Sequence, residues 1–300
     1  APTANGGTLY NGMDGAFLYN RSSNGGLTWD ITDYQIPGTD SSYFSSFDGD
    51  SYHMDALGNT VAIVVGGLGT GVQLYKSTNN GVTWVKSDVL LSDVWFEEAS
   101  TFVSNSFDSA LVTSDGTVNV LIDDNNQAHV WYGEVRIAND DITDGLISYF
   151  PGVNQIMYWN EGMMEDQPIA LSGSLDIDGN GIVDLLTGNV GDDTGQYRFS
   201  GMASHPQAGI DSNGCLYVVY SAIREDLDNG SQHYRHTYVI RSCDNGCTWS
   251  FPIDLTDVDG GANNFKECVY ASIARRVDDN IHVIYMSDVE PGIAVSGDED

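Results

Sequence analysis

Short stretches of alternating apolar and polar residues recur along the chain, each joined to a turn rich in Gly, Asn and Asp. Alternation with a period of two is the pattern of a β-strand with one buried face. Clear examples are GAFLYNR (15–21), GVQLYK (71–76) and HTYVIR (236–241). Helical periodicity is absent throughout, so the pattern predicts an all-β fold.

Each of these three strands runs into a copy of one motif, Ser-x-(Asn/Asp)-x-Gly-x-Thr-Trp. The motif predicts a hairpin turn in which hydroxyls bond the backbone, Asn or Asp caps the turn, and Trp packs between layers. The residues that carry it are Ser22, Asn24, Gly26, Thr28 and Trp29; Ser77, Asn79, Gly81, Thr83 and Trp84; and Ser242, Asp244, Gly246, Thr248 and Trp249.

The spacing of these motifs predicts a repeated unit of one four-stranded β-sheet. Trp29 and Trp84 are 55 residues apart, and Trp84 and Trp249 are three such steps apart, so degenerate copies are expected near 139 and 194. A second series joins an acidic turn to an apolar strand with a mean step of about 56 residues. Its lead acids are Asp55, Asp123, Asp178, Asp211 and Asp278.

Continuous β-repeats of this length predict a β-propeller, with residues 1–300 as a single domain. The repeat count favours five four-stranded blades, with six as the alternative. The C-terminal strands 270–276 and 282–288 lack an outer pair, which the N-terminal hairpin 15–32 could supply. That pairing would close the ring between the two ends of the chain and remove its exposed sheet edges.

The repeated motif resembles the Asp box of the BNR-repeat, sialidase-like propeller superfamily. In that superfamily the box is a structural turn on the outer side of a blade, so the resemblance implies the fold and leaves function open. The stretches SYFPGVNQIMYWNEG (148–162), HYRHTYVIRS (233–242) and DVEPGIAVSGDED (288–300) further resemble uncharacterised secreted propeller proteins of Bacteroidetes-type bacteria. Such proteins are commonly exported by the type IX route with a separate C-terminal sorting domain.

Sialidases combine an arginine triad with a Tyr-Glu nucleophile pair, an Asp acid/base and an Arg-Ile-Pro motif. This chain has eight arginines and lacks Arg-Ile-Pro, and its spacing does not select a triad. The candidates for one are Arg136, Arg198, Arg224, Arg235 and Arg275. The sequence therefore leans towards a protein without catalytic activity. A cluster of Arg, Tyr and paired carboxylates at the channel mouth would favour an enzyme instead.

Composition narrows the class of partner. Acidic residues number 43 against 11 basic ones, for a net charge of −32, which argues against nucleic acid and anionic membranes. No stretch is long and apolar enough to span a membrane. The acidity suits divalent cations and salty surroundings, but a solvated acidic surface that keeps a secreted or cell-surface protein soluble explains it more simply.

DIDGNGIVD (176–184) is the sharpest motif for a metal ion. It sets oxygen ligands at alternate positions around a glycine, as calcium loops do. The expected ligands are Asp176, Asp178, Asn180, the carbonyl of Ile182 and Asp184. Thr187 stands where a helix-loop-helix calcium site has Glu, so the motif resembles the β-hairpin calcium loop of integrin-type propellers, with a structural role.

Four cysteines permit two disulfides and an oxidising compartment. Cys243 and Cys247 flank one box turn, and Cys215 and Cys268 lie near strand starts in neighbouring blades, so these two pairings are expected. Zinc would need four ligands with finger-like spacing, which the chain does not offer.

Together these features predict a secreted or cell-surface, calcium-stabilised propeller that binds an extracellular glycan or protein without catalysis. A sialidase-like glycoside hydrolase is the first alternative. The second alternative is an architectural module of a larger type IX-secreted surface protein. This alternative predicts that the natural chain continues past residue 300.

Overall fold

The computed structural model describes residues 3, 6–44, 46–47, 49–91, 109–139, 141, 143, 146–195, 197–257 and 264–293. Within them the fold is all-β, as predicted, and the helix α1 (Val190–Asp193) is a single turn. The part of the chain that is described has no helix able to cross a membrane.

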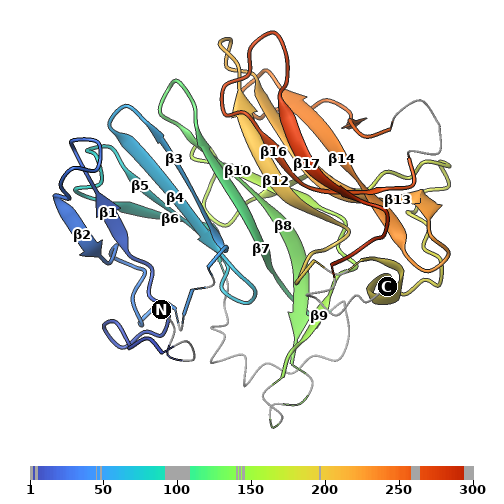
Figure 1. The fold of residues 1–300 in the computed structure, drawn as a ribbon, viewed down its shortest axis with the longest axis horizontal. Helices are drawn as coiled ribbons and strands as arrows, with labels where there is room; N and C mark the ends of the chain where they lie inside the picture. Colours follow the sequence, from blue (N-terminus) through green and yellow to red (C-terminus); the bar gives the residue numbers. More distant parts are fainter. Residues whose placement is uncertain are drawn as a thin grey trace.

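Three full antiparallel sheets follow one another along the chain (Figure 1). The first contains β3 (Tyr52–Leu57), β4 (Thr60–Gly66), β5 (Val72–Ser77) and β6 (Val85–Leu90). The second contains β7 (Leu111–Ile122), β8 (Ala128–Ala138), β10 (Ile156–Asn160) and β11 (Ile169–Ser172), with β9 (Ser148–Phe150) paired to β8. The third contains β12 (Ala203–Ile210), β13 (Leu216–Asp228), β14 (His233–Ser242) and β15 (Ile253–Asp254).

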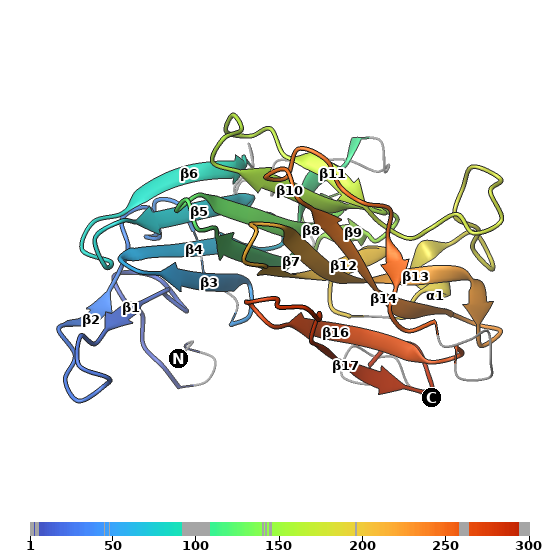
Figure 2. The same cartoon turned by 90° about the horizontal axis from the view of Figure 1, so that it is seen from above.

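Two strand pairs flank these sheets. The N-terminal pair is β1 (Tyr19–Arg21) and β2 (Ile31–Tyr34), and the C-terminal pair is β16 (Glu267–Ile273) and β17 (Val283–Asp288). Among the described residues no β-pairing joins one pair to the other, and Figures 1 and 2 show them apart. The predicted closure of the ring is therefore not seen, and neither is a count of five blades.

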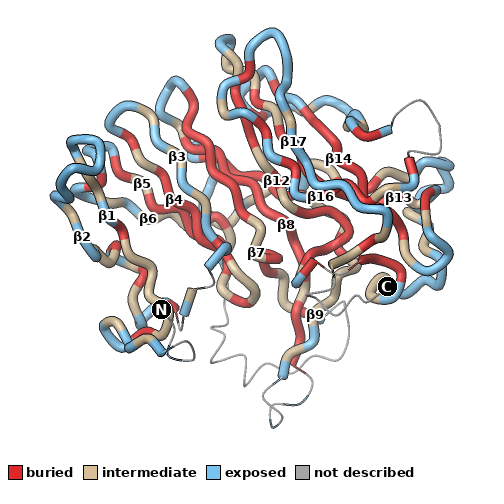
Figure 3. Tube along the Cα trace, viewed as in Figure 1, coloured by how far each residue is buried: buried red, intermediate tan, exposed pale blue. Residues whose placement is uncertain are grey.

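The sheets pack face to face, which explains why their central strands are apolar on both sides. Buried side chains of the first and second sheets form one core, such as Val64 against Val120. Trp131 and Ile210 belong to the core between the second and third sheets. The buried positions, red in Figure 3, accordingly follow the strands, and the exposed ones gather at the turns. The first strands β3, β7, β12 and β16 contact one another in sequence, as the inner strands of propeller blades do.

The acidic turns were predicted well with one exception. The segments led by Asp55, Asp123, Asp211 and Asp278 each form the hairpin between the first two strands of a sheet or pair. Asp178 instead lies in the long connection between β11 and β12. Its motif is therefore not a blade hairpin, which removes one unit from the repeat count.

The expected degenerate boxes near 139 and 194 are also wrong. Position 139 follows β8, with part of the adjoining acidic segment outside the described residues, and position 194 follows α1. The turn that corresponds to a box in the second sheet joins β10 to β11, at residues 161–168. The extra strand β9 and the long loop before β12 shift the register, so a uniform step does not locate these turns.

The three boxes adopt one hydrogen-bonded turn. In each, the serine Oγ accepts the amide of the glycine four residues on, at 2.8–2.9 Å. The Asn or Asp Oδ1 accepts the threonine amide at 2.8–2.9 Å. All three glycines have positive φ, between +75° and +88°, which explains why glycine recurs there.

Two of the boxes pack on a tyrosine of the preceding unit. Trp84 contacts Tyr19 edge to face at 5.1 Å, and Trp249 contacts Tyr158 in the same way at 5.3 Å. Trp29, at the N-terminal end, is 56% exposed, and no ring contact of this kind is found for it within the described part of the chain.

The disulfide pairing differs from the prediction. Cys215 bonds Cys243, whereas Cys247 is free and exposed and Cys268 is free and buried. The register of β13 and β14, with Leu216 opposite Ser242, places Cys215 directly across from Cys243 with their Cα atoms 4.1 Å apart. The prediction relied on proximity along the chain and on neighbouring blades, whereas the strand register decided the pairing.

Candidate functional site

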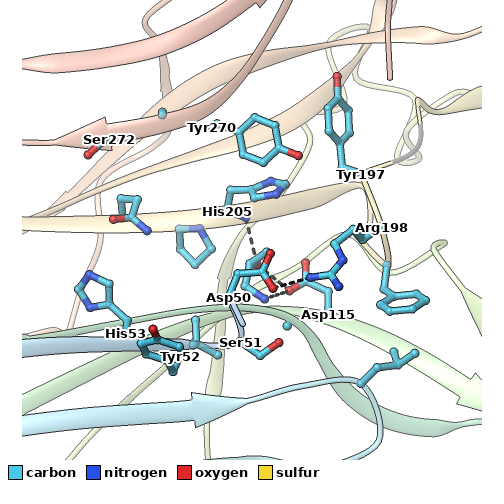
Figure 4. A pocket seen from close by; sticks show the side chains of 18 residues that line it. Asp50, Ser51, Tyr52, His53, Asp115, Tyr197, Arg198, His205, Tyr270 and Ser272 are labelled. Atoms are coloured by element: carbon cyan, nitrogen blue, oxygen red, sulfur yellow. Dashed lines mark hydrogen bonds and ion pairs between the residues drawn. The ribbon is translucent and has the colours of Figure 1, made fainter. Parts of the chain in front are cut away.

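A pocket of about 420 Å³ lies where the first strands of the sheets converge. β3 contributes Tyr52 and His53, β7 contributes Thr117 and Val118, β12 contributes residues 205–207, and β16 contributes residues 270–272. The segments 50–51 and 197–199, which precede β3 and β12, also line the pocket, together with Leu68 and with Asp115 and Gly116 of β7 (Figure 4). Every unit from the first sheet to the C-terminal pair therefore supplies part of one site.

Irregular backbone marks this site. The pairing register shifts in β7, β12 and β16 at the level of the pocket, so these three inner strands bulge there. Gly116 has φ +90° at the first bulge, His205 has φ +58° at the second, and Tyr270 has φ +53° at the third. Arg198, also in the wall, has φ +59°. Left-handed non-glycine residues cost about 1–3 kcal/mol each and cluster at binding sites.

His205 and Tyr270 form an aromatic corner with Tyr197, visible in Figure 4. The rings of His205 and Tyr270 meet edge to face with centroids 4.7 Å apart, and Tyr197 lies 5.7 Å from Tyr270. Burial lowers the pKa of His205 to about 3, and the charge of Arg235 acts in the same direction. His205 is therefore neutral at physiological pH, and its buried Nδ1 has no hydrogen-bond partner among the described residues.

Two acids with raised pKa values stand behind this corner. Burial raises the pKa of Asp115 to about 6, although Ser204 and Thr117 donate hydrogen bonds to it. Burial also raises the pKa of Glu267 to about 7, against the opposing effect of Arg235. Glu267 accepts a 2.6 Å hydrogen bond from the Tyr197 hydroxyl. Both carboxyls are thus already committed to protein donors.

Other polar side chains are held so that they can donate into the pocket. His53 Nδ1 accepts the amide of Val120 at 3.2 Å, and burial lowers the pKa of His53, so its Nε2 carries the proton. The Gln207 side-chain carbonyl accepts from Asn119 at 3.2 Å, which leaves the amide nitrogen Nε2 of Gln207 as a donor. These contacts orient both side chains before any ligand arrives.

The arginines do not assemble a triad at this pocket. Arg198 is the arginine in the described wall, and it pairs with Asp50 at 2.5 Å. Arg235 lies behind the wall and donates to the carbonyls of Met202 and Gly201. Arg224 and Arg275 pair with carboxylates elsewhere, Arg275 with Asp55 at 2.6 Å. Arg136 also does not line the pocket.

The metal motif forms a compact loop, and the structure adds a ligand candidate that the sequence did not indicate. Glu225, on β13, accepts the amides of Ile177, Asp178 and Asp184. Carboxylate oxygens of Asp176, Asp178 and Glu225 lie within 4.8 Å of one another. Asn180 donates to Asp178 and Asp184, and the amide of Gly181 lowers the pKa of Asp176. An all-oxygen, carboxylate-rich set on two segments fits Ca²⁺.

Sequence reasoning missed the pocket almost entirely. Arg198 was one of five arginine candidates, whereas His53, Asp115, His205 and Tyr270 were not singled out. The sequence signal that could have found them is their position. Each of these residues lies in, or just before, the strand that leads into an acidic hairpin turn. The box residues and the metal motif lie outside the described wall.

No family model matches this chain, and no curated protein matches it. Three of the solved structures that align with this chain show low sequence identity and low TM-scores. An ulvan lyase of polysaccharide lyase family 25 has 16% identity over 77% of this chain and 44% of its own, with a TM-score of 0.39. The Hadza microbial sialidase Hz136 has 13% identity over 84% and 46%, with a TM-score of 0.44. A protein of unknown function from Dyadobacter fermentans has 11% identity over 94% and 68%, with a TM-score of 0.39.

These overlaps assign neither a family nor a function to the chain. It spans less than half the length of the ulvan lyase and of the sialidase. The site is therefore interpreted from its own residues.

Proposed function

We propose that the protein binds an extracellular glycan in the central pocket and does not turn it over. The observation that carries this proposal is the make-up of the wall. Tyr52 and Tyr270 are 44% and 38% exposed, so each offers part of a ring to a sugar face. His53 and Gln207 offer oriented donors to sugar hydroxyls. A pocket of this size with a few fixed polar groups is typical of small-ligand sites.

The state of the titratable groups favours binding over catalysis. A histidine with a pKa of about 3 is a weak base, so His205 suits a neutral hydrogen bond better than proton abstraction. Asp115 and Glu267 accept hydrogen bonds from protein hydroxyls, and Asp50 pairs with Arg198. The wall does combine Arg198 with Tyr270 and the acids Asp50 and Asp115, a cluster that would favour an enzyme. An oxygen of each acid is already held by a protein donor, which favours binding.

A glycan array followed by calorimetry tests the proposal. We expect Tyr270→Ala and His53→Ala to weaken binding of any captured glycan at least tenfold, because each removes a wall group. Tyr285→Ala is the matched control, since Tyr285 is also exposed but lies on β17 outside the wall. Equal affinity of all three variants for the glycan would refute the central site.

We further propose that the loop 176–184 binds Ca²⁺ as a structural ion, with Glu225 as an additional ligand. The ion would link the loop between β11 and β12 to strand β13. It would offset the repulsion between the carboxylates of Asp176, Asp178 and Glu225. Calorimetry with Ca²⁺ should give a saturable signal that Glu225→Gln weakens tenfold or more. Glu165→Gln is the control, and equal titrations of the two variants would contradict the proposal.

An extracytoplasmic location fits the disulfide, because such bonds persist in oxidising compartments. We propose secretion or display at the cell surface on this basis. A protein ligand is the alternative outcome of the binding screen. An architectural role within a larger type IX-secreted protein is the outcome if neither glycans nor proteins are captured.

We also propose, as the repeat pattern suggests, that the β1–β2 hairpin completes the β16–β17 pair and closes the ring. The outward edge of β17 and the exposed Trp29 support this, because such edges and rings are normally covered. Hydrogen exchange tests it. Slow exchange of the β17 amides that do not bond β16 supports closure, and uniformly fast exchange of those amides contradicts it.

A sialidase-like glycoside hydrolase is the second candidate, favoured by one contact. Tyr197 and Glu267 form a hydrogen-bonded pair of the kind that sialidases use as nucleophile. Tyr197 is buried and its pKa is raised by burial, so it is a poor nucleophile in this state. Release of 4-methylumbelliferone from a fluorogenic sialoside, lost in Tyr197→Phe, would support this candidate. No release from the wild type would exclude it.

A further inference from the structure

A second cavity of about 310 Å³ adjoins the central pocket. Ser51, Leu68 and Phe199 line both cavities, so the two adjoin at these residues. Ile147 and the phenylalanines Phe44 and Phe47 form much of the remaining wall of the second cavity. The second cavity is therefore the neighbouring space for a substituent on a ligand held in the central pocket.

The described wall of the second cavity carries no charged side chain. Thr70 Oγ1 donates to the carbonyl of Gly67 at 3.1 Å and accepts the Gly67 amide at 3.0 Å. The same carbonyl also accepts from Thr113 at 3.2 Å. These atoms of Thr70 and Gly67 are occupied with one another, so the hydroxyls of Ser46 and Ser51 are the remaining polar side-chain groups in a described wall that is otherwise Phe, Leu, Ile and Gly. The cavity thus favours an apolar group.

Size and shape narrow that group further. A methyl or acetyl substituent would leave most of a 310 Å³ cavity without contacts, which forfeits dispersion energy. The ring centroids of Phe44 and Phe47 lie 4.4 Å apart in a tilted arrangement, and Phe199, from the segment before β12, also lines the cavity. Aromatic rings pack well in tilted or edge-to-face contact with such walls.

We propose that this apolar cavity is a subsite for an aromatic group carried by the glycan, such as an aryl ester on a sugar hydroxyl or an aryl aglycone. The proposal rests on the proposed glycan binding in the central pocket and names the class of ligand: a sugar with an aryl substituent. Leu68 and Phe199 would contact the junction between the sugar and its aromatic group.

Paired synthetic glycosides provide the probes. For each sugar in a panel, calorimetry compares the 4-nitrophenyl glycoside with the methyl glycoside, and free 4-nitrophenol is measured alone. We expect 4-nitrophenyl glycosides to bind at least tenfold more tightly than methyl glycosides of the same sugar.

Two variants of opposite kind test the subsite. Phe47→Ser removes part of the apolar wall, and Gly67→Ala places a methyl group 3.5 Å from Thr70 Oγ1 and 3.7 Å from Ser51 Oγ, without a backbone clash. Each should reduce the aryl preference below threefold and leave the methyl glycoside unchanged. Phe251→Ser is the control, because Phe251 is 77% exposed and lies outside both walls.

The outcomes separate the two proposals. Equal affinity for aryl and methyl glycosides, both weakened by Tyr270→Ala, would overturn the aryl subsite and leave glycan binding standing. Binding of free 4-nitrophenol as tight as that of every glycoside would overturn glycan binding and the inference with it. An aryl preference that survives both Phe47→Ser and Gly67→Ala would place the aromatic group elsewhere and refute the subsite.

Discussion

Replacing the box glycine by alanine should change the free energy of unfolding by different amounts in the three copies of the turn. An ideal Cβ on Gly246 would lie 2.0 Å from the hydroxyl of Tyr158, and one on Gly81 would lie 2.3 Å from that of Tyr19. A Cβ on Gly26 would meet nothing within 4 Å. The turns share their hydrogen bonds and positive φ, so the neighbouring unit makes the difference.

Alanine at any of the three glycines costs about 1–2 kcal/mol for the left-handed backbone. Gly26→Ala should lose no more than this. At Gly81 and Gly246 the tyrosine must also move, which adds about 1–3 kcal/mol for overpacking. We therefore expect Gly246→Ala to destabilise the protein by roughly 2–5 kcal/mol in total.

Urea unfolding at constant pH measures these differences from the midpoint and slope of each transition. A double-mutant cycle of Gly246→Ala with Tyr158→Ala isolates the clash, because alanine lacks both the hydroxyl and the ring carbons that would lie within 2.7 Å of the new methyl group. The double variant should lose less than the sum of the single losses. Equal losses in Gly26→Ala and Gly246→Ala, with no coupling to Tyr158, would refute the packing argument.

Four further predictions concern charge, crosslinking, thiol labelling and metal binding. Asp115 has a raised pKa of about 6 when folded, against 3.8 for the free group, so its contribution is present at low pH and is lost as the pH rises through 6. Its share of the wild-type decline in unfolding free energy between pH 4 and pH 7 is roughly 2 kcal/mol, and Asp115→Asn should lack that share in urea titrations at both pH values. Cys215→Ser opens a disulfide with a separation of 28 residues, which should cost about 3–4 kcal/mol by urea unfolding. In the native wild type, a thiol reagent should label the exposed Cys247 first, as peptide mapping would show. Millimolar Ca²⁺ should raise the melting temperature of the wild type and leave that of Glu225→Gln nearly unchanged.

Local patterns predicted the elements that neighbouring residues encode. Alternating apolar residues located the strands, because every second side chain of a strand faces one side of its sheet. The box glycines Gly26, Gly81 and Gly246 were recognisable because a left-handed turn position selects glycine wherever it occurs. Both patterns depend on a few consecutive residues.

The predicted repeat count was wrong because of insertions between strands, and the predicted cysteine pairing was wrong because it depends on the strand register. DIDGNGIVD looks like the acidic hairpins around it, but a long connection carries it away from the inner strands. Cys247 is closest to Cys243 along the chain, yet the pairing of β13 with β14 brings Cys215 opposite Cys243. Sequence spacing does not carry this register information.

From the amino-acid order alone one learns that the protein is a chain of β-hairpins with a recurring turn and an acidic surface. The pocket could be found only in the tertiary structure, because its wall is formed by segments far apart in the sequence. These include residues 50–53, 115–118, 197–199, 205–207 and 270–272. Those segments meet when face-to-face packing of the sheets brings their inner strands together. The neutral state of His205 and the raised pKa of Asp115 follow from the burial that this packing creates. Such burial is a property of the assembled sheets, and no short stretch of sequence records it.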